Sequence, residues 1–570
     1  MSKVAVVGAG PVGLCCALLL ARFGVETAVF ERNAGTSVHP RGHVVNARSL
    51  EILRSLGLEQ SVRAESLPAS RNQGVSFLRR LSEPDIAVLR TQGIPERDEP
   101  QREASPCLRA SCPQDRLEPI LLAAARSEPL VQLDFSSDVQ TVEQDGEGVR
   151  ITGTGPQGAF DRAFDYAVGA DGARSTVRNQ IGIAMKGRGR IGRQIGIYFE
   201  ADLWPLIQDR PYLLWWIYNA RTCGVLIALD GRRRWTYNFA FDERETAADF
   251  TPERCQAILR AVLGTDVPVE IRSIVPWRMQ ALLAERMGDR RVFLAGDAAH
   301  PLPPTGGQGM NTGIADVHNL AWKMALVLTG RAAPTLLETY DAERRPVASF
   351  NIEQSVANAL KMAEFGLSGM ATPDSDMARS LDGPDRVAAE ARLREAVPHL
   401  REHFDYLGQT FGQSYGRGAL LPDGTAEPLE AFSVHTYRPS ARPGSRAPHI
   451  WLDQGGQAVS TIDLIGFDGF TLFATPEQAG WSEAFGEAIQ TRYLAGRSWV
   501  VGPGCGLDDP SGRFRKLYGL EGGGAVLVRP DGHVAARWFA PSPDPAADLA
   551  RAFDAILGGA AVAAASRSAA

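Results

Sequence analysis

Cysteine is sparse in this sequence, and the few cysteines are not arranged as in a metal site or a redox pair. The 570 residues include seven cysteines, and no two of them form a C-x-x-C pair. That spacing is typical of structural zinc sites and of dithiol redox centres. Scattered cysteines also argue against a disulfide framework. We therefore expect no bound metal and a reducing, cytoplasmic location.

Long apolar runs and an excess of basic charge are also lacking. The most apolar candidate, NLAWKMALVLTG, is interrupted by Lys323 and is shorter than the roughly 18 residues that cross a bilayer. The apolar stretch at 13–21 has no basic flank before it, unlike a signal peptide. The net charge of -6 gives no basic footprint for nucleic acid. We therefore expect neither a membrane nor a nucleic acid partner, and a small ligand instead.

The composition that is present is that of a large globular protein. Apolar residues make up 44% and charged residues 22%, close to the average of folded proteins. One hydrophobic core does not grow to this size, so roughly three or four domains are expected. A Pro/Gly-rich stretch, RPSARPGSRAPH, is typical of a linker before the last of them.

Periodicity predicts a different kind of structure for successive parts of the chain. A strand at 3–7, a glycine turn, an apolar helix and a second strand at 26–30 form the beginning of a parallel sheet. Alternating segments between 193 and 241 predict an antiparallel sheet. The rest of the pattern predicts helices at 309–328, 334–362 and 385–407 and a mixed α/β module after about residue 440.

The glycine turn has the spacing of a dinucleotide site. Gly8, Gly10 and Gly13 form G-x-G-x-x-G between a strand and a helix, which allows a tight turn and close approach of the backbone to a pyrophosphate. Glu31 follows the second strand, where a carboxylate can accept hydrogen bonds from a ribose diol. Because this carboxylate would repel a ribose phosphate, the nucleotide is expected to be FAD or NAD rather than NADP.

Two later motifs favour FAD. In YAVGADGARSTVR a strand leads to Asp171, and in RRVFLAGDAAHPLPPTGGQGMN a strand leads to Gly296 and Asp297. Asp297 can accept from ribityl hydroxyls, while the backbone N–H groups of 306–311 can face an anionic flavin ring at a helix start. Each aspartate alone is also explained as a helix cap. Their order on one chain together with the glycine turn indicates a flavin site.

These motifs together resemble the class A flavoprotein monooxygenases, the family of the p-hydroxybenzoate and phenol hydroxylases. GAGPVG, DGARSTVR and GDAAHPLPPTGGQGMN carry the resemblance. The segment from APHIWL to LVRPDGHVAARW is similar to the C-terminal thioredoxin-like domain of phenol, chlorophenol and aromatic polyketide hydroxylases, and it lacks the C-x-x-C of a redox thioredoxin. The resemblance implies an α/β fold in which a Rossmann-like FAD-binding domain is interleaved with an antiparallel-sheet substrate domain. The expected domains are FAD binding at 1–72, 105–190 and 275–365, substrate binding at 73–104 and 191–274, a helical segment and linker at 366–439, the thioredoxin-like domain at 440–558, and a mobile tail at 559–570.

The resemblance also implies how the cofactors bind. FAD would be held tightly but not covalently, with Arg41 at the pyrophosphate and Gln114 near the flavin. NADPH or NADH would be a transient reductant without a domain of its own, and the protein would be a homodimer. The full predicted cofactor set is Gly8, Gly10, Gly13, Glu31, Arg32, Arg41, Gln114, Asp171, Gly296, Asp297, Pro304, Gly309, Met310 and Asn311.

Aromatic residues are concentrated on the strands that this family places over the flavin. A flat slot for an aromatic ring is one explanation, and a plain sheet core is the other, because aromatic residues favour strands in any case. With a side-chain period of two, Trp235, Tyr237 and Phe239 share one strand face. The predicted substrate-binding residues are Trp216, Tyr218, Trp235, Tyr237 and Phe239.

Three further residues have side chains that could take part in chemistry. His43 lies two residues after Arg41, where phenol hydroxylase carries an acidic partner for its substrate, so it is the candidate catalytic base for a phenolic proton. A packed loop histidine is the alternative. His300 is expected to be structural, bonding to backbone near the flavin ring. Cys505 lacks the context of a nucleophile and is rejected as one.

The predicted function is therefore hydroxylation of a phenol, usually ortho to its hydroxyl, with NAD(P)H and dioxygen through a flavin hydroperoxide. An alternative substrate is a fused-ring aromatic polyketide in antibiotic biosynthesis. A flavin halogenase is disfavoured, because LLWWIYN does not fit the W-x-W-x-I-P that such an enzyme would show. A flavoprotein that binds an aromatic ligand without catalysis remains a third class.

Overall fold

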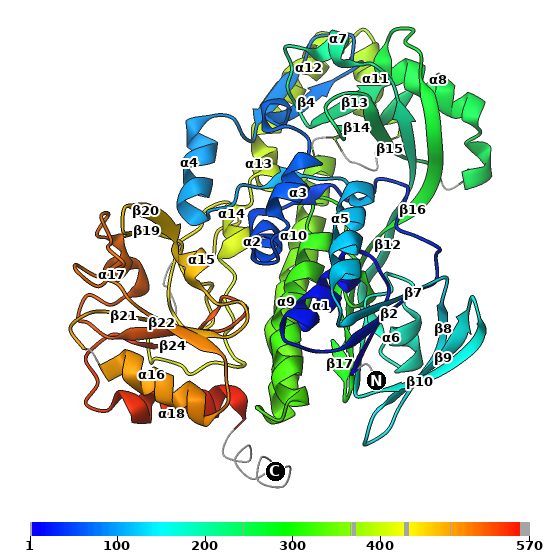
Figure 1. The fold of residues 1–570 in the computed structure, drawn as a ribbon. Coiled ribbons are helices and arrows are strands. Elements are labelled where there is room, and N and C mark those ends of the chain that lie inside the picture. Colours follow the sequence, from blue (N-terminus) through cyan, green and yellow to red (C-terminus); the bar gives the residue numbers. More distant parts are fainter. Residues whose placement is uncertain are drawn as a thin grey trace.

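The computed structural model describes residues 3–242, 244–364, 366–367, 372–426, 432–478 and 480–558. Three large sheets make up most of it, and two long helices, α9 (Gly309–Leu328) and α10 (Thr335–Glu364), run through its middle (Figure 1). The predicted mobile tail at 559–570 lies outside the described residues.

The first sheet has the predicted parallel βαβ beginning. Its strand order is β17-β18-β11-β1-β2-β7, and all neighbouring pairs are parallel except β17 with β18. Helix α1 (Pro11–Arg22) connects the first two strands. The strands span β1 (Val4–Val7), β2 (Thr27–Glu31), β7 (Val131–Phe135), β11 (Tyr166–Gly169), β17 (Gly288–Asp289) and β18 (Val292–Leu294).

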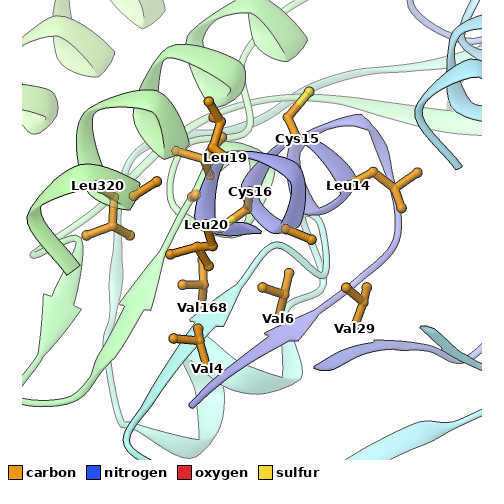
Figure 2. Packing of buried hydrophobic residues seen from close by; sticks show 14 of the residues in the cluster. Val4, Val6, Leu14, Cys15, Cys16, Leu19, Leu20, Val29, Val168 and Leu320 are labelled. Carbon is orange, nitrogen blue, oxygen red and sulfur yellow. The ribbon is translucent and has the colours of Figure 1, made fainter. Parts of the chain in front are cut away.

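Helix α1 is buried on nearly all sides, which explains its almost uniformly apolar sequence. Figure 2 shows Leu14, Leu19 and Leu20 packed among strand residues such as Val6 and against α9. Its two cysteines are fully buried, and burial raises the pKa of Cys15 to about 12. These thiols are structural, because a buried thiol with a raised pKa stays protonated.

A three-stranded meander that the sequence analysis did not predict packs on the β2 region of the first sheet. Its order is β10-β9-β8. The Phe160 ring of the meander stacks on Phe30 of β2, with 5.2 Å between ring centroids. The strands are β8 (Asp138–Gln144), β9 (Val149–Gly155) and β10 (Gly158–Phe164).

The predicted antiparallel sheet is present and larger than expected. Its order is β16-β12-β15-β14-β13-β4-β5, and only β13 with β4 is parallel. Two strands extend far toward the first sheet, β12 (Met185–Glu200) and β16 (Glu270–Ala284) (Figure 1). The others are β4 (Gly74–Leu78), β5 (Ala87–Arg90), β13 (Leu214–Asn219), β14 (Thr222–Ala228) and β15 (Arg234–Ala240).

Helices cover this sheet unequally. Helix α8 (Pro252–Leu263) packs on one face, while α11 (Asp376–Asp382) and α12 (Arg386–Ala396) pack on part of the other. The prediction of a single helix at 385–407 was wrong. It is divided at a 3-10 turn, Val397–Leu400, where the proline at 398 cannot donate a backbone hydrogen bond.

The C-terminal module is thioredoxin-like in its strand order. The order is β22-β21-β23-β24, with β21 parallel to β22 and antiparallel to β23. The connection after β21 contains no cysteine, and Cys505 lies exposed in a later loop. Its elements are β21 (Phe470–Ala474), α16 (Gly480–Thr491), β22 (Gly496–Val500), α17 (Arg513–Tyr518), β23 (Ala525–Val528), β24 (Val534–Trp538) and α18 (Pro545–Leu557).

A buried cluster of charges joins this module to α9 and α10. Glu343 of α10 contacts Lys323 Nζ of α9 at 2.7 Å and Arg529 of the module at 2.8 and 2.9 Å. Arg529 also pairs with Asp531, and all four charged side chains are at most 1% exposed. Burial alone would raise the pKa of Glu343, but Arg529 and Lys323 hold it at about 2. The module is therefore part of the buried structure rather than an appended unit.

We predict that Arg529→Leu lowers stability strongly, because it leaves Asp531 buried without its partner. Breaking a buried ion pair from one side typically costs about 3–5 kcal/mol. The measurement is the denaturant midpoint followed by intrinsic fluorescence. Cys505→Ser, an exposed change in the same module, is the control and is expected to leave the midpoint and turnover unchanged. A midpoint for Arg529→Leu equal to that of the control would contradict the role of the cluster.

Candidate FAD and substrate site

The glycine turn between β1 and α1 is shaped by the absence of side chains. Gly8 has φ of +106°, and a Cβ there would lie 2.4 Å from the Ala170 carbonyl oxygen. A Cβ on Gly13 would lie 1.9 Å from the Gly8 carbonyl oxygen, so α1 can approach the turn this closely only because residue 13 is glycine. Gly10 is the N-cap of α1 and offers no side-chain cap. The first N–H groups of α1 are thus left for an anion such as a pyrophosphate.

Glu31 at the end of β2 holds this turn in place. Its Oε2 accepts a hydrogen bond from the Ala9 N–H at 2.9 Å, and its Oε1 accepts one from the Asn33 N–H at 2.9 Å. The residue is half-buried, while the neighbouring Arg32 is exposed. The carboxylate therefore lies beside the turn, as expected for a ribose-binding group.

Asp171 gives the most specific indication that this region binds a ligand. It follows β11, and its Oδ2 accepts the Val177 N–H at 3.1 Å at the start of α6 (Thr176–Gln180). Its Oδ1 is buried and has no hydrogen-bond partner within the described part of the chain. Burial raises the pKa of this carboxyl. A buried acceptor without a partner is costly, which fits a hydroxyl-bearing ligand at this position.

Asp297 lies after β18 in a 3-10 turn, Gly296–Ala298, and opens toward the same region. Its side chain is exposed to solvent although protein atoms surround it closely, and this partial desolvation raises its pKa. Gly309, the first residue of α9, lies nearby, because a Cβ there would be 3.8 Å from Asp297 Oδ1. Asp297 and the N-terminus of α9 therefore face a common space, in which Met310 is half-buried and Pro304 is exposed.

The side chain of Asn311 is used within the protein, so its predicted place in the cofactor set depends on its backbone N–H. The side-chain amide donates to the carbonyls of Val44 at 3.0 Å and Gly307 at 2.7 Å, and its oxygen accepts the Asn46 N–H at 2.9 Å. All of its polar atoms are thus used between two loops. Its side chain positions these loops, and only its backbone N–H is left to face a ligand.

His300 is structural, as expected, but its partner is not backbone. Its Nε2 lies 2.6 Å from Asp316 Oδ2, and Asp316 Oδ1 in turn accepts from Arg344 Nε at 2.9 Å. All three side chains are at most 5% exposed. The prediction of a backbone bond was therefore wrong, because a buried carboxylate on α9 is within reach of the ring.

Helix α5 (Gln114–Ser127) supplies one predicted residue and two that were missed. Gln114 donates to Glu118 Oε1 at 2.5 Å, and Glu118 Oε2 accepts the Ser37 N–H at 2.6 Å. Asp115 pairs with Arg234 of β15 and so ties the first sheet's helices to the second sheet. Glu118 could have been found as a carboxylate in the apolar stripe of an amphipathic helix, whereas no sequence signal pairs Asp115 with Arg234.

His43 lies on the loop between Arg41, which is exposed, and a short strand, β3 (Val44–Val45). Its Nδ1 is 3.0 Å from Ser111 Oγ. Burial lowers the pKa of His43 to about 4. A phenol has a pKa of about 10, so complete proton transfer to this imidazole is uphill by roughly six pKa units. Without substrate, His43 is therefore a neutral imidazole that can accept a hydrogen bond, and its role as the base for the phenolic proton stays a prediction.

The five predicted substrate-binding aromatics do not line one slot. Trp235, Tyr237 and Phe239 share one face, as predicted, but that face is the core under α8. Trp216 and Tyr218 lie on the opposite face in the core under α11 and α12. The Tyr218 hydroxyl donates to the Leu367 carbonyl at 2.7 Å, and the Tyr237 hydroxyl bonds Thr222 Oγ1 at 2.6 Å. The alternation of side chains along the strands separates the two groups, so the plain sheet core explains most of the set.

One half of the second face is not covered by α11 and α12. There the sheet presents partly exposed side chains from β12, β14, β15 and β16. The loop at 36–43 meets this half, because His39 Nδ1 lies 2.7 Å from Ser273 Oγ of β16. The open half is thus next to the loop that carries Arg41 and His43. Its partly exposed residues include Tyr198, Ile227, Asn238 and Trp277.

None of the helices in the described ranges has the length and hydropathy of a membrane span. The described side chains also contain no group of three or more His, Cys, Asp or Glu residues placed to hold a metal ion.

The glycine turn, the two aspartates and the start of α9 define a flavoprotein that binds FAD, and the comparisons give its class. The family model described as FAD binding domain matches residues 1–355, and the one described as aromatic-ring hydroxylase, C-terminal, matches residues 440–560. The chain belongs to the FAD-dependent aromatic-ring hydroxylases, and it is an aromatic monooxygenase of that family.

The relatives of the chain are named for more than one substrate. It is 34% identical to a 2,4-dichlorophenol 6-monooxygenase of Delftia acidovorans, covering 95% of this chain and 96% of that protein. It is 36% identical to a tetracenomycin A2 monooxygenase-dioxygenase of Streptomyces glaucescens, covering 97% and 96%. The solved structure of the flavin-dependent monooxygenase PieE with FAD and substrate is 33% identical, with a TM-score of 0.91 and coverage of 98% and 99%.

We predict that Asp171→Ala weakens FAD binding, because it removes a buried acceptor, Oδ1, that has no partner in the part of the chain that the structure describes. A hydrogen bond to a charged group contributes about 1.5–3 kcal/mol, which corresponds to roughly a 10- to 150-fold rise in Kd. The measurement is titration of the apoprotein with FAD, followed by quenching of flavin fluorescence. Asp161→Ala, an exposed aspartate of the meander, is the matched control. Equal FAD affinity in both variants would remove Asp171 from the site.

Proposed function

We propose that this monooxygenase hydroxylates a phenolic substrate, usually ortho to its hydroxyl, with NADPH or NADH as reductant and dioxygen as the oxygen source. The observation that carries the proposal is the position of the open half of the second sheet, beside the loop with Arg41 and His43. An aromatic ring held there would lie next to the FAD-binding loops. We also propose that the protein is cytoplasmic and that it forms a homodimer.

The residues present fit the cofactor, since Asp171 has a buried acceptor without a partner among the described residues, and a Cβ does not fit at Gly8 or Gly13. Glu31, Asp171, Asp297 and the start of α9 would hold FAD. When bound, FAD supplies electron transfer from the nicotinamide and activation of dioxygen. The chain's own part is to bind the ring, orient it and exclude water from the reacting carbon.

His43 would orient the phenolic hydroxyl. Its imidazole is neutral at physiological pH, because burial lowers its pKa to about 4. Ser111 Oγ, 3.0 Å from Nδ1, fixes the ring and leaves Nε2 for the substrate. If Ser111 accepts from Nδ1–H, Nε2 is an acceptor for the phenol hydroxyl. A hydrogen bond of this kind raises electron density on the ring without requiring His43 to keep the proton.

A fused-ring aromatic polyketide is the second candidate substrate. A structure of aklavinone-11 hydroxylase with FAD and aklavinone is 32% identical to this chain, with a TM-score of 0.84. A substrate panel of chlorophenols and fused polyphenols, with NAD(P)H consumption followed by absorbance and products by mass spectrometry, tests both candidates. Nicotinamide consumption that no aromatic compound stimulates, with no oxygenated product, would refute the proposed function.

We predict that His43→Ala uncouples NAD(P)H oxidation from hydroxylation. FAD should stay bound, but the phenol would lack the group that orients its hydroxyl. Losing such assistance typically slows the step by roughly a hundredfold, so hydrogen peroxide should replace hydroxylated product. The measurement is the ratio of product to nicotinamide consumed, with a peroxide assay alongside. The control is His399→Ala, an exposed histidine. If an FAD-replete His43→Ala enzyme still couples nicotinamide oxidation to hydroxylation normally, His43 has only a packing role.

The lowered pKa of His43 gives a separate prediction on pH dependence. A group with a pKa of about 4 is neutral above pH 5, so it contributes no titration step between pH 5.5 and 8. Protonation below pH 4 would convert the acceptor to a donor and should lower kcat/KM. The measurement compares pH profiles of wild type and His43→Ala. A step near pH 6.5 in the wild type that the variant loses would show that His43 titrates as an ordinary base.

A further inference from the structure

Gly196, in the middle of β12, lies on the open half of the second sheet, and three polar atoms from three elements converge above it. A Cβ placed on Gly196 would be 2.9 Å from Asn238 Oδ1, 3.4 Å from His39 Nε2 and 3.7 Å from Trp277 Nε1. Asn238 is the cross-strand neighbour of Gly196 on β15, Trp277 lies on β16, and His39 belongs to the loop before Arg41. We call this arrangement the Gly196 subsite.

These three atoms have no protein partner among the described residues. His39 uses Nδ1 for Ser273 Oγ, which leaves Nε2 toward Gly196. Asn238 Nδ2 donates weakly to Thr236 Oγ1 at 3.5 Å, which turns Oδ1 toward the same point. Asn238 and Trp277 are partly exposed, so the subsite opens to a ligand.

An unpaired indole N–H alone would not indicate a site. The buried indoles of Trp215 and Trp216 also lack partners, but both lie in the apolar cores of the sheet. Trp277 differs because its N–H faces the same point as an amide oxygen and an imidazole nitrogen. Because Gly196 has no side chain, these three atoms can approach its Cα closely, and a Cβ there would lie only 2.9 Å from Asn238 Oδ1. A donor and an acceptor that lie close together and have no protein partner can bind a small polar group.

The chemistry of the subsite favours a neutral oxygen group. Trp277 can only donate and Asn238 Oδ1 can only accept, so a hydroxyl, which does both, satisfies them together. Burial, together with the nearby Arg41, lowers the pKa of His39 to about 4, so no cation is present on His39 to bind a carboxylate. A chlorine substituent would leave the amide oxygen and the indole N–H unpaired.

We propose that the Gly196 subsite binds a second hydroxyl of the aromatic substrate, distinct from the phenolic hydroxyl that His43 contacts. The proposal rests on the proposed function and narrows its substrate class to polyhydroxylated aromatic compounds rather than halophenols. Trp277 and Asn238 are then specificity-determining residues. Gly196 determines how deeply the hydroxyl can enter between them.

The test compares naphthalene-1,5-diol with 1-naphthol, which differ by one hydroxyl. Binding to the oxidised holoenzyme is measured by perturbation of the FAD absorbance spectrum. We expect wild type to bind the diol roughly tenfold more tightly, because one buried hydrogen bond corresponds to about a factor of ten. Trp277→Phe keeps the ring and removes the N–H, and Asn238→Leu removes the acceptor. Both variants should abolish this preference, while Trp451→Phe, an exposed indole of the C-terminal module, should retain it.

Two results would overturn the subsite. One is equal affinity of wild type for the two probes. The other is a preference for the diol that survives in both Trp277→Phe and Asn238→Leu with normal FAD content. Failure of the proposed function appears differently, as tight binding of the diol without any hydroxylated product from it or from other phenols. A gain in 1-naphthol affinity in Asn238→Leu, where an apolar side chain meets an apolar ring edge, would support the subsite further.

Discussion

The close approach of helices α1 and α9 to the strand ends of the first sheet is the constraint on which the rest of the structure depends. A Cβ on Gly313 of α9 would lie 2.5 Å from Val12 Cγ2 and 2.9 Å from Gly296 Cα. A Cβ on Gly13 of α1 would meet the Gly8 carbonyl. Because both positions are glycine and carry no Cβ, the N-termini of both helices and the ends of β1, β11 and β18 can meet in one region. The FAD-binding groups are brought together by that contact.

Helix α9 also carries charged side chains that are paired in the protein interior. Its inner side carries Asp316, which holds His300 and Arg344, and Lys323, which pairs with Glu343. The C-terminal module completes this second pair through Arg529. A helix that begins at the flavin loop therefore ends in the core shared with the module. Loss of the module would remove Arg529 from Glu343 and leave Lys323 as its partner in the pair between α9 and α10, so the module has a structural role that does not need a dithiol.

The sequence was sufficient to predict the parts of the structure that depend on residues close together in the chain. The helix predicted at 309–328 has the bounds of α9, and the glycine turn, Asp171 and Asp297 lie where strand–turn–helix patterns predicted them. The strand β16 was not predicted, because Pro276 interrupts its alternating pattern. The proline is tolerated at this position because β16 is an edge strand of its sheet. The first half of β12, rich in glycine and arginine, becomes a strand only through pairing with β16.

The substrate side was harder to predict because strand alternation gives the faces of a sheet but not what covers them. Trp235, Tyr237 and Phe239 share a face as expected, yet α8, from a segment with no predicted helix, covers that face. The open half is instead defined by where α11 and α12 end. Its polar groups come from residues 39, 238 and 277, which are distant in sequence and meet only because β12 pairs with both β15 and β16. Specificity in this chain therefore depends on a convergence around a glycine, and a glycine in a strand gives no sign of what surrounds it.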